Sequence, residues 1–180
     1  MRLFIGLPLS EAAAENTSGL AQRCALHIPG RYSLPENYHM TLAFLGEVPA
    51  ECFDRAADAL CAFAAQFPAP RITLEELSHF RQPGNAVLIR RVSSPNGLAA
   101  MHAALLSELD ARGLPRTEGP FSPHVTLARH ADITCADLNA LSAPSVSFTA
   151  PDAALYLSAR DETDTLRYTP LVRAAFQVFP

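Results

Sequence analysis

The stretch HMTLA at residues 39–43 returns as HVTLA at residues 124–128, so the chain carries the pattern His-x-Thr-Leu-Ala twice. Residues two apart in a β-strand point to the same face of a sheet. Each copy therefore predicts a strand with one buried apolar face and one open face that presents an imidazole and a hydroxyl. Two such strands side by side would frame a small site with two histidines and two threonines.

The alternation along each strand predicts which side chains share the open face. His39 lies with Thr41, and His124 lies with Thr126. By the same parity, Phe44 is expected on the buried face with the intervening aliphatic residues. One His-x-Thr sequence occurs by chance in many proteins. Its repetition in equivalent surroundings favours a functional pair.

Those surroundings indicate an internal duplication, because a strand, a helix and a motif strand occur in residues 1–46 and again in residues 86–129. The first helix is expected to begin at the N-cap Ser10. The expected elements of the repeat are strands 3–7, 38–45, 86–92 and 123–129 and helices 12–26 and 98–109. A helix at 50–67 and strands at 72–77, 145–149, 154–158 and 171–179 complete the prediction.

This order of elements predicts an α+β fold. Two duplicated α/β lobes are related by a pseudo-two-fold axis, with antiparallel-rich sheets facing a central cleft and helices outside. Residues 1–180 are expected to form one bilobal domain, because 180 residues with 49% hydrophobic content can bury a substantial core. Each lobe contributes one motif strand to the cleft.

The cysteine content and the hydropathy of the chain indicate where in the cell the protein is expected. The four cysteines are scattered without CxxC spacing, which is typical of reduced thiols. Residues 1–10 are too short and too soon interrupted by Pro8 for a signal peptide, and no apolar run reaches membrane-spanning length. We therefore expect a cytoplasmic monomer with no membrane association.

All 14 basic residues are arginine, and the formal net charge is −4. Without lysine there can be no Schiff base, no P-loop lysine and no covalent lysine–nucleotide intermediate. A mildly negative chain also lacks the broad basic surface of a protein that coats nucleic acid. Any contact with nucleic acid should be local, at an end or a short single strand.

Two histidines and two threonines suit phosphodiester chemistry. Histidine titrates near pH 6.5, so one neutral and one protonated imidazole form a base and an acid on opposite sides of a reacting atom. Two hydroxyls can donate hydrogen bonds to the non-bridging oxygens. Two histidines are too few ligands for a catalytic zinc site, so neither a metal nor another cofactor is expected. No Gly-x-Ser-x-Gly turn supports a serine triad.

The segments around the two motifs and at both ends of the chain narrow the class of protein further. The chain contains PEN at 35–37, HMTLAFLG at 39–46, FSPHVTLAR at 121–129, MRLFI at 1–5 and RYTPL at 167–171. Together these segments resemble the two-histidine phosphoesterases. Within that superfamily they resemble the bacterial and archaeal RNA 2′,3′-cyclic phosphodiesterases, which are also described as 2′-5′ RNA ligases. The resemblance covers nearly the whole chain.

The resemblance implies hydrolysis of a terminal RNA 2′,3′-cyclic phosphate to a 2′-phosphomonoester. It makes His39 the general acid that protonates the departing 3′-oxygen and His124 the general base that activates water; the sequence itself is symmetric on this point. Thr41 and Thr126 would hold the phosphate oxygens. Arg129 would add a cationic contact, although strict alternation places it on the face opposite His124.

The expected partner is an RNA 3′ end with a 2′,3′-cyclic phosphate, for which tRNA fragments are one source. Four residues near the motifs are candidates for contact with the substrate: Tyr32, Phe80, His130 and Tyr168. A surface or capping role is expected for His102, and His79 is expected in a loop near the cleft mouth. Four arginines are expected either beside the RNA end or on a solvated face: Arg31, Arg81, Arg90 and Arg91.

Three alternatives stay open at the level of sequence. The substrate could be another cyclic or 2′-5′-linked nucleotide. The reaction could run in reverse and join RNA ends through a 2′-5′ bond without an energy source. A non-catalytic module that binds RNA ends is the third alternative. Neither the physiological RNA nor the preferred terminal base can be read from the residues.

Overall fold

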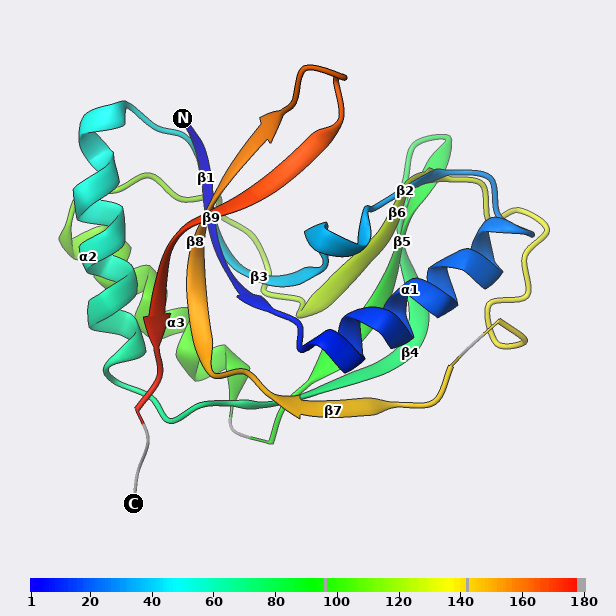
Figure 1. Cartoon of the computed structure of the whole chain (residues 1–180), viewed down its shortest axis with the longest axis horizontal. Coiled ribbons are helices and arrows are strands. Elements are labelled where there is room, and N and C mark those ends of the chain that lie inside the picture. Colours follow the sequence, from blue (N-terminus) through cyan, green and yellow to red (C-terminus); the bar gives the residue numbers. More distant parts are fainter. Residues whose placement is uncertain (96, 142, 178–180) are drawn as a thin grey trace.

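In the computed structural model, which describes residues 1–95, 97–141 and 143–177, one antiparallel sheet runs through both halves of the chain and curls into a half-barrel (Figure 1). The strand order of this nine-stranded sheet, within the described residues, is β7-β4-β5-β6-β3-β1-β8-β9, with β2 paired to β6. The two motif strands β3 (His39–Glu47) and β6 (His124–Ala131) are neighbours at its centre. The predicted α+β class and antiparallel sheet are confirmed.

The remaining strands are β1 (Arg2–Pro8), β2 (Arg31–Tyr32), β4 (Arg71–Gln82), β5 (Asn85–Ser93), β7 (Val146–Thr149), β8 (Asp152–Arg160) and β9 (Leu166–Ala175). The helices are α1 (Glu11–Ala25), α2 (Phe53–Ala64) and α3 (Leu98–Ala111), with short 3-10 turns η1 (Pro35–Asn37) and η2 (Ala50–Cys52). As predicted, the Ser10 side chain caps α1 by accepting a hydrogen bond from the amide of Ala13 at 3.3 Å.

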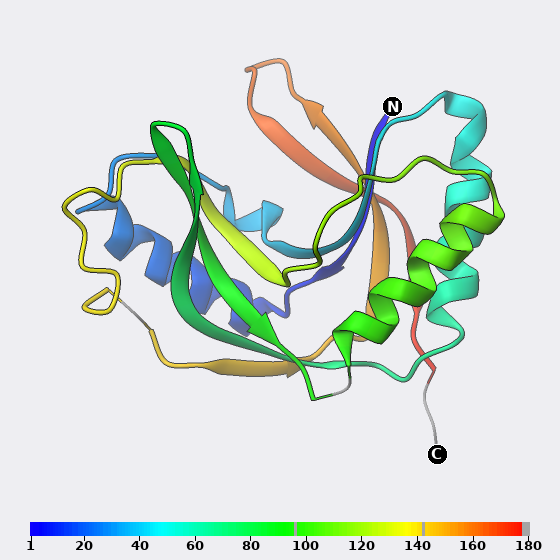
Figure 2. The ribbon, with the colours of Figure 1, turned by 180° about the vertical axis from the view of Figure 1, so that it is seen from behind.

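The helices exchange sides between the two halves. Helix α1 follows β1 but packs against β6 and β7, whereas α3 follows β5 but packs against β3 and α2. In Figure 1 α1 crosses the half of the sheet formed by β4, β5 and β6, and Figure 2 shows α2 (cyan) and α3 (green) together beside the other half. Each half therefore depends on the other to cover its apolar face.

The core lies between the sheet and these helices, and the motif strands are anchored in it. Met40, Leu42, Val125 and Leu127 are at most 2% exposed. Burial of an aliphatic side chain of this size stabilises a fold by about 1.5–3 kcal/mol. These four side chains hold both strands against movement, so the polar residues that alternate with them have fixed positions.

Several sequence predictions about individual elements are wrong. The short strand β2 was not expected, and residues 71–82 continue as one strand through His79, which was placed in a loop. The helix expected at 50–67 begins as the turn η2 and ends at Ala64. The last expected strand, 171–179, falls largely within β9, and its residues 178 and 179 lie outside the described residues.

Arg90 is also misplaced by the sequence prediction, because its side chain is fully buried. Its guanidinium donates hydrogen bonds to the carbonyls of Glu75 (2.9 Å) and Pro144 (2.6 Å) and to Oδ1 of Asn16 (2.6 Å). A buried charge must be satisfied by such partners. Arg90 thus joins α1, β4 and the segment before β7, and it has no access to a ligand.

Candidate active site

The motif strands meet where Met40 pairs with Val125 in antiparallel register. In that register His39 lies across from Thr126, and the threonine of the first motif lies across from His124. Diagonal neighbours on one face of an antiparallel pair are about 7–8 Å apart. The register therefore sets the two histidines at a separation that leaves space for one tetrahedral group between them.

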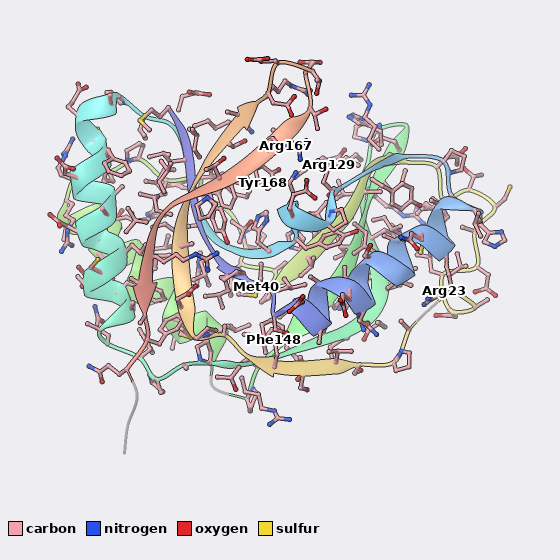
Figure 3. The ribbon with its side chains drawn as sticks, viewed as in Figure 1. Arg23, Met40, Arg129, Phe148, Arg167 and Tyr168 are labelled. Atoms are coloured by element: carbon pink, nitrogen blue, oxygen red, sulfur yellow. The ribbon has the colours of Figure 1, made fainter. Side chains whose placement is uncertain are left out.

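Both motifs open into one pocket of about 210 Å³. Its lining consists of Ser33, Asn37, His39, Thr41, Phe44, Phe80, Gln82, Val87, His124, Thr126, Arg129 and Tyr168. The structure thus brings together the two histidines, the two threonines and the arginine that the sequence singled out. Figure 3 labels Arg129 and Tyr168, which approach the pocket from β6 and β9.

Each motif strand contains a β-bulge at the same place. Adjacent residues of β1 pair with residues 41 and 43, which leaves Leu42 as an extra residue in β3. Adjacent residues of β5 pair with residues 126 and 128, which leaves Leu127 extra in β6. An extra residue reverses the alternation of side chains beyond it.

The bulges overturn two predictions made from strict alternation. Phe44 was expected in the core, but it is 40% exposed and lines the pocket. Arg129 was expected on the face opposite His124, but it lines the same pocket as that histidine. The two residues occupy equivalent positions, directly after the Thr-Leu-Ala of each motif. Sequence parity could not reveal this, because the pattern carries no residue that marks a bulge.

The backbone orients both imidazoles in the same way. Nδ1 of His39 lies 2.7 Å from the carbonyl oxygen of Asn37, and Nδ1 of His124 lies 2.7 Å from that of Ser122. A carbonyl only accepts, so each Nδ1 carries the proton and donates it. The neutral ring then has its lone pair on Nε2. In His39 this atom lies 3.0 Å from Oγ1 of Thr41.

Aromatic rings surround His39 more completely than its counterpart. Its ring centroid lies 4.6 Å from that of Phe4, 5.0 Å from that of Tyr168 and 5.7 Å from that of Tyr156. Burial lowers the pKa of His39 to about 4, with smaller contributions of the same sign from the charges of His124 and Arg129. The hydrogen bond to the Asn37 carbonyl opposes this shift. The unliganded protein therefore holds His39 neutral at pH 7.

His124 has a single aromatic neighbour among the described ring contacts, the Phe80 ring, which meets it edge-on at 4.9 Å and 85°. Burial lowers the pKa of this histidine too; the hydrogen bond to the Ser122 carbonyl opposes that shift and the Arg129 charge adds to it. Both imidazoles are therefore neutral at pH 7, with Nε2 unprotonated, and a bound anion is the change that would favour protonation.

The four expected substrate contacts separate into two pairs. Phe80 and Tyr168 line the pocket, whereas Tyr32 and His130 line an adjoining hollow of about 440 Å³. The Tyr32 hydroxyl donates to the Ile28 carbonyl at 2.9 Å, and burial raises its pKa to about 12. Its ring packs on the core and lies outside the lining of the pocket, so contact between Tyr32 and the substrate stays a prediction.

Asn37 and Gly6 position His39, and the sequence assigned neither a role. The amide of Asn37 donates to the Leu166 carbonyl at 2.8 Å and accepts from the backbone N–H of Tyr168 at 3.0 Å. It thereby fixes η1, whose carbonyl holds His39, to β9. A Cβ on Gly6 would lie 2.8 Å from the Met40 carbonyl oxygen and 3.3 Å from Cδ2 of His39. Only glycine leaves room there.

A surface or capping role was expected for His102, but its side chain supports a motif strand. Its Nδ1–H donates to the carbonyl of Leu42, the bulged residue of β3, at 2.8 Å. The ring stacks on Phe121 with centroids 4.2 Å apart. The equivalent bulge carbonyl, that of Leu127, accepts from the backbone N–H of Ser33 at 2.8 Å.

Two features are absent from the part of the chain that the structure describes. No group of three or more His, Cys, Asp or Glu side chains is arranged to hold a metal ion in residues 1–95, 97–141 and 143–177. None of the helices in that same part of the chain combines the length and the apolar character that crossing a membrane requires.

Solved structures of related proteins share this fold over nearly their whole length. TT0787 of Thermus thermophilus superposes with a TM-score of 0.78 at 24% identity, covering 98% of each chain. LigT of Escherichia coli in its apo form gives a TM-score of 0.70 at 29% identity, again covering 98% of each chain. The fold thus defines a structural class that includes both proteins.

The model of the 2′-5′ RNA ligase superfamily matches residues 9–162, and the chain belongs to this family. An RNA 2′,3′-cyclic phosphodiesterase of Escherichia coli K12 is 33% identical over 183 residues, covering 97% of this chain and 96% of that protein. An RNA 2′,3′-cyclic phosphodiesterase of Geobacillus stearothermophilus is 28% identical over 180 residues. The chain spans 57% of the length of the latter protein.

Proposed function

We propose that this chain hydrolyses RNA 2′,3′-cyclic phosphate termini to 2′-phosphomonoesters by acid–base catalysis between His39 and His124, without a metal ion. The observation that carries the proposal is the single pocket lined by both histidines, both motif threonines and Arg129. The family match and the names of the two phosphodiesterase relatives support it. LigT structures with 3′-AMP and with phosphate support a nucleotide ligand for this fold.

In the proposed reaction the phosphate lies between the two imidazoles. Nε2 of His124 removes a proton from water, and the water oxygen forms a bond to phosphorus. The bond from phosphorus to the 3′-oxygen breaks as His39 donates its Nε2 proton to that oxygen. The product keeps the phosphate on the 2′-oxygen. His39 ends neutral and His124 ends protonated, so one proton exchange with solvent restores the starting state.

This division of roles requires a proton on His39, which the unliganded site disfavours. A bound phosphodiester supplies the missing interaction, because a negative charge beside an imidazole raises its pKa. The low intrinsic basicity of the buried ring then helps the reaction, since a more acidic donor transfers its proton more readily. Binding and protonation are therefore coupled.

The other polar groups hold the phosphate. The hydroxyls of Thr41 and Thr126 donate hydrogen bonds to its non-bridging oxygens, and the guanidinium of Arg129 supplies a charge-assisted contact. Phe80 and Phe44 line both the pocket and a neighbouring hollow of about 300 Å³ that is more apolar. We assign the terminal base to that hollow, where an aromatic ring can stack on it.

The test is product analysis. The purified protein is incubated with an oligonucleotide that ends in a 2′,3′-cyclic phosphate, with and without a chelator, and the 2′- and 3′-monoesters are resolved. We expect the 2′-monoester at the same rate in both samples. A 3′-monoester, or loss of activity with the chelator, would contradict the mechanism.

A panel of 3′,5′-cyclic and 2′-5′-linked nucleotides tests the alternative substrates, and RNA halves with 5′-hydroxyl ends test the reverse ligation. Binding of the cyclic-phosphate end without turnover would favour the non-catalytic module. The cytoplasmic location, the monomeric state and a tRNA-fragment substrate stay predictions.

A further inference from the structure

A second hollow continues from the catalytic pocket on the side away from the apolar one. It has a volume of about 440 Å³ and shares Ser33, Asn37, Arg129 and Tyr168 with the pocket. We call it the basic groove. Its remaining lining consists of Arg31, Tyr32, Leu34, His130, Arg160, Thr165 and Leu166. A ligand in the pocket can therefore extend into the groove without leaving the surface.

The charge of the groove has one sign. Arg31, Arg129 and Arg160 line it together with His130, and no carboxylate stands among the described residues of the lining. Arg160 has a partner in Asp164, at 3.3 Å from its carboxylate. In the described part of the chain, neither Arg31 nor Arg129 has a hydrogen-bonded or ion-paired side chain. The groove thus offers two unpaired guanidinium groups although the whole chain has a net charge of −4.

Arg31 and Arg129 lie directly opposite each other on the paired strands β2 and β6. Like charges at such positions destabilise a sheet. An anion between the two side chains would remove that penalty and gain two charge-assisted contacts. One of the two, Arg129, already reaches the catalytic pocket. The anion would therefore lie within one nucleotide of the reacting phosphate.

We propose that the basic groove binds the phosphate on the 5′ side of the terminal nucleotide, so that the preferred substrate is an RNA strand and not a mononucleotide. This inference rests on the proposed function. A ribose whose cyclic phosphate is fixed at O2′ and O3′ carries its base on C1′ and its chain on C4′, the two carbons on either side of the ring oxygen. The apolar hollow and the basic groove each share four lining residues with the pocket and none with each other, so the two substituents can enter different hollows.

The experiment compares two substrates that differ by one phosphate: adenosine 2′,3′-cyclic phosphate and the same molecule with a 5′-phosphate. We expect the wild-type protein to favour the second by about tenfold in kcat/KM, as one charge-assisted contact provides. Arg31→Gln should bring that ratio close to one. Arg71→Gln is the matched control, because Arg71 is exposed at the far end of β4 and should leave the ratio unchanged.

A dinucleotide that ends in a 2′,3′-cyclic phosphate extends the test to RNA. Its KM should rise with salt more steeply than that of the unphosphorylated mononucleotide, with a slope larger by about 0.7 for one added phosphate contact. Equal kcat/KM values for the two mononucleotides, or an equal loss on both in Arg31→Gln, would overturn the groove assignment and leave the proposed function intact. If the wild type cleaved neither the two mononucleotides nor the dinucleotide, both the groove assignment and the proposed function would be overturned.

Discussion

The two motif strands have the same backbone but different surroundings. Both carry a bulge at the leucine of His-x-Thr-Leu-Ala, and both fix the histidine through Nδ1 to the carbonyl two residues earlier. Around β3, however, three aromatic rings enclose the histidine, and the residue after the motif is Phe44. Around β6 the corresponding residue is Arg129, and one aromatic ring touches the histidine.

The comparison teaches that the motif sets geometry and its neighbours set electrostatics. Two identical imidazoles in identical environments would have equal pKa values and could not divide the tasks of acid and base. Aromatic burial on one side and a guanidinium on the other make the two halves of the pocket different. The following predictions test where that difference lies.

Loss of either histidine should have the largest effect. His39→Ala and His124→Ala should each lower kcat by about 10²–10⁴-fold, because each removes one proton transfer. A nucleoside 2′-(p-nitrophenyl phosphate) separates the roles, because it keeps its phosphate on the 2′-oxygen as the product does and its leaving group departs without protonation. On this ester, His39→Ala should approach the wild-type rate and His124→Ala should stay inactive. His27→Ala, at an exposed position, is the control. If the p-nitrophenyl ester instead restored the activity of His124→Ala and not that of His39→Ala, the acid and base roles of the two histidines would be reversed.

The equivalent positions 44 and 129 should differ in what they contribute. Arg129→Gln removes a charged hydrogen bond to the phosphate and should lower kcat/KM by about ten- to a hundredfold. Phe44→Leu should raise KM and leave kcat near the wild-type value, because this ring is assigned to the base. Steady-state kinetics on the cyclic-phosphate dinucleotide measures both. A larger loss of kcat in Phe44→Leu than in Arg129→Gln would contradict the assigned roles.

The pH dependence should reveal the burial of the pair. Both histidine pKa values are lowered, that of His39 to about 4. The free protein holds a single proton on the pair only between the two lowered values, so kcat/KM should reach its maximum below pH 6.5. The substrate's charge raises both values, so the kcat profile should lie at higher pH. Coincident profiles, or a kcat/KM maximum above pH 6.5, would show that burial does not govern these groups.

A glycine next to β3 has no glycine counterpart next to β6. Gly6 pairs with Thr41, whereas Ile89 pairs with Thr126. Gly6→Ala places a methyl group against the Met40 carbonyl and the His39 ring, which should cost about 1–3 kcal/mol of folding free energy and lower kcat. Gly19→Ala is the matched control, because its Cβ would meet only Arg23 Nη1, at 3.8 Å, and alanine favours a helix. Urea unfolding and kcat would be measured on both variants.

Much of this arrangement follows from the sequence alone. Repetition of the motif and the period of two in its apolar residues predicted adjacent strands with four polar side chains on one face. The predicted orientations of the side chains beyond the bulge were wrong for a physical reason. Leu42 and Leu127 are buried on the correct side, so nothing in the pattern indicates that the next residue is also buried and that Phe44 and Arg129 then face the pocket.

Long-range contacts account for the remaining errors. Arg90 could not be recognised as buried, because its partners come from three separate segments of the chain. The two hydrogen bonds of the Asn37 side chain reach Leu166 and Tyr168, which lie 129 and 131 positions further along the chain. Such contacts form only when distant segments of the chain come together in the folded protein, and a local sequence pattern carries no record of them.

The smallest effect is expected at His102, which holds the bulge of β3 through a side chain where β6 uses the backbone of Ser33. His102→Leu leaves the Leu42 carbonyl without its donor and should cost about 1 kcal/mol of folding free energy. A displaced bulge would also move Thr41, so kcat should fall. The decrease should be smaller than in Gly6→Ala, because His102 does not contact the His39 ring whereas a methyl group on Gly6 would. His102→Asn retains a donor in the position of Nδ1 and should restore kcat. If both variants lose stability but keep the wild-type kcat, His102 supports only the fold and the bulge maintains its own geometry.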